Sequence, residues 1–171
     1  MKKIFLAVFI FAALALLGHR LILNAYDGKD KVDSLLQEAS NILKEKKTME
    51  ELTQAAKMVE ELAGLVGKDA SLKTRFRVLL REDPDVYKKK IIIDTLIAIK
   101  DPEVVVILME LLDDSNTAVR AVAIDELGML KVNAALEKLE AVAKSDPNPK
   151  LRLLALNSIE NIQNSSKPKN A

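Results

Sequence analysis

Three stretches of the sequence superimpose without a gap, and this repetition constrains the fold more than any other feature. They begin at Asp83, Asp114 and Asp146 and read DPDVYKKKIIIDTLIAIK, DSNTAVRAVAIDELGMLK and DPNPKLRLLALNSIENIQ. The leading aspartates are 31 and then 32 residues apart, and apolar residues recur within each stretch at helical spacing. Such a period is typical of an α-solenoid, whose stacked helix pairs form an extended surface for holding a partner and supply no chemistry of their own.

Composition supports an all-α protein. Of 171 residues, 49% are hydrophobic but only 4% are aromatic, so the core has to be built from Leu, Ile, Val and Ala. Glycine and proline number five each, and no run of alternating β-branched residues indicates a strand. The length allows one compact domain with an N-terminal addition.

Charge and cysteine usage exclude several classes of partner and site. The net charge is +1, but residues 1–25 hold three basic residues and no acid, which leaves 23 basic against 25 acidic residues in the remainder. A nearly neutral body lacks the positive field that nucleic-acid phosphates require, so we expect no nucleic-acid binding. The chain has no cysteine, which excludes disulfides, thiolate metal sites and a lipidated cysteine.

Residues 1–25 predict export. Lys2 and Lys3 precede a long apolar run, and two interpretations remain open. As a signal peptide, the segment would be cleaved after Ala25. As an anchor, residues 4–23 would span about 30 Å of bilayer with the N-terminus in the cytoplasm. The first places the rest of the chain in the periplasm. The second makes it a single-pass inner-membrane protein whose C-terminal domain lies outside the cytoplasm.

The remainder divides into three parts. Residues 30–67 predict a hairpin of two amphipathic helices that caps the solenoid, with a capping box at Thr48 and Glu51 opening the second helix. Residues 70–163 hold the repeats, with first helices at 70–82, 102–113 and 133–144 and second helices at 84–99, 117–131 and 149–163. Asp83 and Asp101 are expected to cap helices that begin at the proline after each of them, as Asn148 is before Pro149. Residues 164–171 predict a disordered tail.

The repeats resemble HEAT repeats, and among these the bacterial HEAT-like variety first associated with phycobilisome lyases. The resemblance rests on the leading aspartates, on a basic residue six positions later and on a small residue within the apolar helix, at Ala123 and Ala155. The first repeat departs from this pattern, with Lys88 and Ile92 at two of the packing positions. The resemblance implies a short right-handed α-solenoid of antiparallel helix pairs, an armadillo-type superhelix. It also implies a structural ladder between neighbouring repeats, formed by Asp83, Lys89, Asp114, Arg120, Asp146 and Arg152.

The sequence holds no recognisable constellation for catalysis. His19 is the single histidine and lies in the targeting segment, so the usual nucleophilic pairs and zinc sites have no ligands in the rest of the chain. Adjacent carboxylates such as Glu60 and Glu61 diverge on a helix and are poor partners for acid–base work. We expect no catalytic, cofactor-binding or metal-binding residues, and no enzyme.

One repeat column remains as a candidate binding site. Asp94, Asp125 and Asn157 could line the inner helices as a polar strip for a partner, or simply be exposed positions. We therefore predict a non-enzymatic scaffold or adaptor of the bacterial cell envelope that binds another protein. The alternatives are a structural envelope component that self-associates and, from another class, an enzyme accessory related to bilin lyases.

Overall fold

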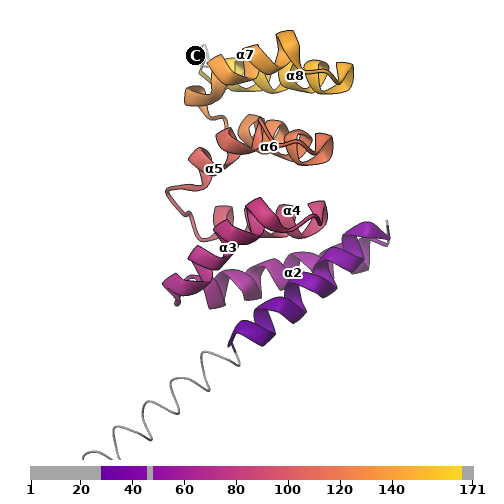
Figure 1. The fold of residues 1–171 in the computed structure, drawn as a ribbon, viewed down its shortest axis with the longest axis vertical. Coiled ribbons are helices and arrows are strands. Elements are labelled where there is room, and N and C mark those ends of the chain that lie inside the picture. Colours follow the sequence, from indigo (N-terminus) through magenta and orange to yellow (C-terminus); the bar gives the residue numbers. More distant parts are fainter. Residues whose placement is uncertain (1–27, 46–47, 167–171) are drawn as a thin grey trace, which may run out of the picture. The chain divides into compact units, whose positions relative to one another are not determined.

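The computed structural model describes residues 28–45 and 48–166, and all regular structure within these ranges is helical, as predicted (Figure 1). The predicted signal or anchor segment, residues 1–25, lies outside the described residues. Among the helices that are described, none is long and apolar enough to cross a membrane. The chain divides into two compact units, which meet at Phe76 and Arg77 inside one helix.

The first unit contains the predicted amphipathic helices. Residues 28–44 are helical, and α2 (Met49–Val66) follows. Helix α3 (Ala70–Glu82), predicted as the first helix of the repeats, crosses the boundary between the two units. The capping box is present, because Glu51 N–H donates to the Thr48 hydroxyl and Thr48 N–H donates to the Glu51 carboxylate. The apolar stripe of each helix is buried, as the amphipathic pattern predicts. Its members include Val32, Leu36, Ala39, Leu62 and Val66.

The second unit contains the repeats. Its helices are α4 (Val86–Ala98), α5 (Val104–Leu111), α6 (Thr117–Met129), the 3₁₀ turn η1 (Asn133–Ala135), α7 (Leu136–Ser145) and α8 (Pro149–Ser166). The pair α5 and α6 lies between α4 and the pair α7 and α8 (Figure 1), and α6 packs against both α4 and α8. Residues 164–166, which the sequence assigns to the tail, continue α8.

The packing columns of the repeats form a continuous core. Each second helix turns the same apolar positions inward, and these positions are fully or almost fully buried in all three repeats. They are Ile92, Ala123 and Ala155; Leu96, Leu127 and Ile159. Because Ile92 is as deeply buried as the two alanines, the first repeat keeps the pattern despite its larger side chain. Stacked repeats that share one core in this way form the α-solenoid that the period predicts.

The leading aspartates do not cap the second helices directly, so the prediction for Asp83 is wrong. Each carboxylate accepts a backbone N–H two residues later, and the residue there is the cap whose side chain meets the helix N–H groups. The first links are Asp83 with Asp85, Asp114 with Asn116 and Asp146 with Asn148, at 2.7–2.8 Å. The caps then accept from Tyr87, Ala118 and Lys150, at 2.9–3.0 Å. Two turns in series satisfy more orphan N–H groups than one cap would.

Helix starts at two prolines shift accordingly. Pro84 lies in the turn, and α4 begins at Val86 after the cap Asp85. Asp101 likewise accepts from Glu103 N–H at 2.9 Å, so α5 begins at Val104 rather than at Pro102. At the third proline the prediction is correct, because α8 begins at Pro149.

Gly128 lets α6 and α8 approach closely. A Cβ built on this glycine would lie 2.6 Å from Ser158 Oγ and 3.1 Å from Ser158 Cα. The approach is held by polar contacts, since Ser158 donates to the carbonyl of Ile124 at 3.1 Å and Asn161 donates to the carbonyl of Gly128 at 2.9 Å. A side chain at this position would have to push the two helices apart.

We therefore expect Gly128→Ala to lower the free energy of unfolding by about 1–3 kcal/mol, the usual cost of forcing extra atoms into a packed site. The matched control is Gly64→Ala in α2, where nothing lies within 4 Å of an added Cβ. That change should raise stability by about 0.5–1 kcal/mol, because alanine is the better helix former. Urea unfolding of both variants measures the difference, and equal stability of the two would contradict the close approach.

Candidate functional site

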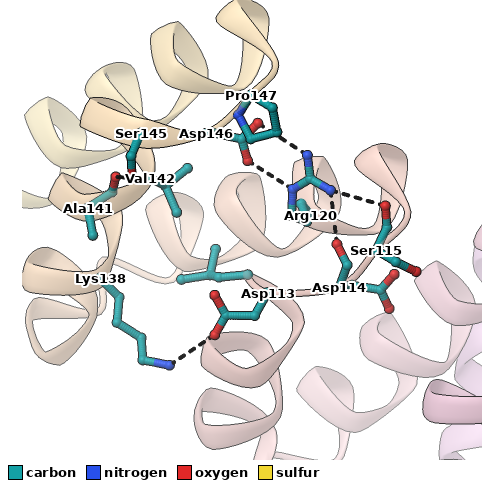
Figure 2. Close-up of a pocket in the computed structure, with 11 residues that line it drawn as sticks. Asp113, Asp114, Ser115, Arg120, Lys138, Ala141, Val142, Ser145, Asp146 and Pro147 are labelled. Atoms are coloured by element: carbon teal, nitrogen blue, oxygen red, sulfur yellow. Dashed lines mark hydrogen bonds and ion pairs between the residues drawn. The ribbon is translucent and has the colours of Figure 1, made fainter.

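The ladder residues join each second helix to the next repeat. Lys89 Nζ of α4 lies 3.3 Å from Asp114 Oδ2, and Arg120 of α6 donates from Nε and Nη2 to the two oxygens of Asp146, at 2.8 and 3.1 Å. Figure 2 shows the Arg120 side chain between that carboxylate and the turn that precedes α6. The bidentate arrangement is the stronger of the two because both oxygens are held by charged donors.

Arg120 is also tied to its own repeat. Its Nη1 donates to the carbonyls of Asp114 and Ser115, at 2.9 and 3.3 Å (Figure 2). Every nitrogen of the guanidinium therefore has an acceptor within the protein. This arrangement favours a structural role for the ladder over the binding of an anionic ligand.

The two ends of the ladder differ from its middle. Asp83 lies at the start, and its carboxylate is 3.7 Å from Lys88 of the same repeat. Arg152 lies at the other end, where its Nη1 donates to the carbonyl of Asp146 at 2.8 Å, as Arg120 does to Asp114. No carboxylate of the described residues lies within ion-pair distance of Arg152.

The contact between Arg120 and Asp146 changes the titration of both groups. The hydrogen bond to Asp146 is the main cause that raises the pKa of Arg120 above its ordinary value, against the opposing effect of burial. The hydrogen bonds from Arg120 lower the pKa of Asp146, and the Asn148 N–H adds to this. Both side chains are buried, so each charge depends on the other for its solvation.

Arg120→Ala should lower the free energy of unfolding by about 3–5 kcal/mol, because it leaves the buried Asp146 carboxylate without its counter-charge. Arg152→Ala is the matched control, since Arg152 occupies the same column and makes the same carbonyl contact but no ion pair with a carboxylate of the described residues. Its cost should be about 1 kcal/mol, that of one hydrogen bond. Chemical denaturation compares the two, and equal losses would argue against the ladder as the source of stability.

The stabilising effect of Asp146 should disappear in acid. Its pKa in the folded protein lies below the value of about 3.9 expected in the unfolded chain, so its contribution is fully present above about pH 4 and is lost as the pH falls. Asp146→Asn should therefore destabilise the protein at neutral pH and progressively less below about pH 4. Unfolding free energies measured across this range test it. A cost that stays constant with pH would contradict the assignment.

A hollow of about 590 Å³ lies beside this contact, between the turn before α6 and helix α7 (Figure 2). Lys138 of α7 reaches across it, with Nζ 3.7 Å from Asp113 and 3.2 Å from the carbonyl of Met109. The charged groups that line this hollow thus pair with one another rather than pointing together into its centre. Within the described residues, no group of three or more His, Cys, Asp or Glu side chains could hold a metal ion.

The structure separates the three residues that were predicted to bind a partner, Asp94, Asp125 and Asn157. Asp94 is half-buried and pairs with Lys90 Nζ at 2.9 Å. Asp125 and Asn157 are exposed and line one hollow of about 250 Å³ between α6 and α8, together with Gly128, Met129, Leu154, Ser158 and Asn161. The column therefore supplies two residues to a shared surface, while the third belongs to a polar link between α4 and α6.

That link is centred on Lys90. Besides Asp94, its Nζ contacts the buried carboxylate of Glu126 in α6 at 3.0 Å. Burial opposes the charged form of Lys90, but its hydrogen bonds and the two nearby carboxylates outweigh this and raise its pKa. Lys90 is thus fixed in position at the edge of the exposed surface.

A second hollow on the same helices was missed by the sequence reasoning. It has a volume of about 320 Å³, lies between α4 and α6, and is mainly apolar. Its lining is Val86, Tyr87, Lys90, Ala118, Ala121 and Val122. A sequence signal was present four positions after the leading aspartates, where Tyr87 and Ala118 occur. These two residues lie on a helix face that is not part of the core.

Comparison with known proteins identifies the repeat. A family model described as HEAT repeats matches residues 74–160, about half of the chain. The chain belongs to the HEAT-repeat family. Searches of curated proteins and of solved structures gave no match. HEAT repeats generally mediate binding between proteins, and the exposed second-helix face described above is a surface of the kind that such repeats present.

Proposed function

We propose that this HEAT-repeat protein is a non-enzymatic adaptor of the cell envelope, which binds another protein along the exposed face of α4, α6 and α8. The observation that carries the proposal is the pair of hollows on either side of α6, one mainly apolar and one lined by Asp125 and Asn157. Both hollows lie on second helices, so one extended partner segment that crosses α6 would reach both.

The chemistry of the two hollows suggests what the partner presents. The hollow between α4 and α6 offers Tyr87 and small apolar side chains, with the Lys90 ammonium at its edge. The hollow between α6 and α8 offers a carboxylate, two amides and the exposed thioether of Met129. Tyrosine and methionine are enriched in protein interfaces. A partner segment with apolar side chains at one end and hydrogen-bond donors at the other matches this surface.

The envelope location rests on residues 1–25. A basic start followed by a long apolar run is the pattern of an export signal or an anchor, and the two lysines favour a cytoplasmic N-terminus. Either form delivers the repeats to the outer side of the inner membrane. The adaptor then acts in the periplasm or at the membrane surface.

The test is capture of the partner by the intact tagged protein from solubilised membranes and from the periplasmic fraction. Asp125→Lys combined with Ala121→Arg should reduce the captured partner at least about tenfold, because the first reverses a charge and the second fills the apolar hollow. The double variant should melt within a few degrees of the original protein, since Asp125 is exposed and Ala121 borders the hollow.

The control variant carries Glu137→Lys and Glu140→Lys, two exposed changes on α7 away from both hollows. It should capture the partner as the original protein does. Equal capture by all three proteins would overturn the assignment of the surface. Recovery of the chain in the cytoplasmic fraction would overturn the proposed location.

A further inference from the structure

Helix α8 exposes a residue at a position that the two earlier repeats bury. Ten residues after the leading aspartates, Ile93 and Ile124 are both 0% exposed, whereas Leu156 of α8 is 53% exposed. Leu153, one turn earlier on the same stripe, is 61% exposed. At the position of Leu153 the earlier repeats have Lys90, whose ammonium contacts Glu126 of the following repeat, and Ala121, which lines the apolar hollow. In α8, Leu153 and Leu156 form an exposed apolar strip.

Charges of opposite sign flank this strip. Arg152 lies four residues before Leu156 and Glu160 lies four residues after it. At the position of Glu160 the earlier repeats have Ile97 and Gly128, so among the three repeats an acid occurs there only in α8. Arg152 is held in place by its bond to the carbonyl of Asp146, and Glu160 is exposed.

Arg152, Leu156 and Glu160 follow one another along α8 as basic, apolar and acidic residues. This order is complementary to the same order in a second helix that runs in the opposite direction. In an antiparallel pair of α8 helices centred on Leu156, each residue faces the one equally far on the other side of the centre. Arg152 of one copy then comes within reach of Glu160 of the second copy, and the same pair forms again at the other end. A contact in which one patch serves both subunits is isologous, the arrangement of a closed two-fold dimer.

We propose that α8 joins two copies of this chain in an antiparallel, two-fold symmetric dimer centred on Leu156. Leu153 and Leu156 supply the apolar centre, and two pairs of Arg152 with Glu160 set the direction of the helices. The proposed partner surface includes Asn157, which directly follows Leu156, but the lining of its two hollows does not include Arg152, Leu153, Leu156 or Glu160.

Cross-linking tests the two-fold centre directly, because the chain contains no cysteine. A residue on the axis meets its own counterpart, so full-length protein carrying Leu156→Cys should form a covalent dimer under mild oxidation in detergent. The control is Val106→Cys on α5, which is 51% exposed and should stay monomeric. A contact between one pair of helices is smaller than a standard interface of about 1,600 Å². Cross-linking is suited to it because oxidation traps even a short-lived contact. Equal cross-linking of the two variants would overturn the proposal.

A charge exchange separates a second copy from any other occupant. In the Leu156→Cys background, Arg152→Glu and Glu160→Arg should each reduce cross-linking at least about tenfold, because each places like charges opposite one another. The protein carrying both changes should cross-link as the parent does, since the pairs are restored with reversed direction. Melting temperatures show whether Arg152→Glu is folded, and the exposed Glu160→Arg provides the same test without that concern.

Other occupants predict a different pattern. If an acidic helix end of another protein covered the strip, Arg152→Glu would remove the contact and Glu160→Arg would not restore it. Failure of the double exchange to restore cross-linking would therefore overturn the dimer. It would leave the capture experiment on the α6 surface unaffected.

Discussion

The buried contact between Arg120 and Asp146 is the interaction on which the stacking of the repeats depends. Arg120 contacts the turn before its own helix and the leading aspartate of the next repeat, so one side chain fixes two turns and the spacing between them. Asp146 in turn organises the start of α8 through Asn148. A change in the length of either repeat would move a charge into the interior without a partner, at a cost of several kcal/mol. This requirement accounts for the near-constant period of 31 and 32 residues.

The same contact leaves the middle of each second helix available for a partner. The ladder lies at the N-terminal ends of α6 and α8, where the turns bring Arg120 and Asp146 together (Figure 2). The hollow that borders Asp125 lies further along α6 and α8, whereas the apolar hollow is lined by Ala118, Ala121 and Val122, which are near Arg120 in the sequence but do not include it. The ladder residues Arg120 and Asp146 are therefore distinct from those that we assign to the partner, although Lys90 and Asn161 both line a hollow and link neighbouring helices. A solenoid can then change its partner surface without losing its ladder, because the two sets share no side chain.

The sequence predicts the helical repeats and their core well, because buried columns such as Leu96, Leu127 and Ile159 recur at a fixed period. It predicts helix starts less well. A leading aspartate followed by proline suggests a single cap, whereas Asp83 and Asp101 begin turns that delay the helix to Val86 and Val104. The signal was present in the acid or amide two positions after each leading aspartate. The two successive turns become evident only when each leading aspartate is considered together with the residue two positions later.

Binding residues are harder to predict, because equivalent positions in the repeats do not show which side chains surround each of them in the folded protein. Asp94, Asp125 and Asn157 are equivalent in the repeat, yet Lys90 binds the first and leaves the others exposed. Four residues earlier, the first repeat has Lys90 where the others have Ala121 and Leu153, and this decides the difference. Position within the array matters as well, since Ile93 and Ile124 are core residues while Leu156 is surface. In a solenoid the conserved period describes what every repeat must do to stack. The departures from the period, and helix α8 above all, are where we place the proposed partner surface and the proposed dimer contact.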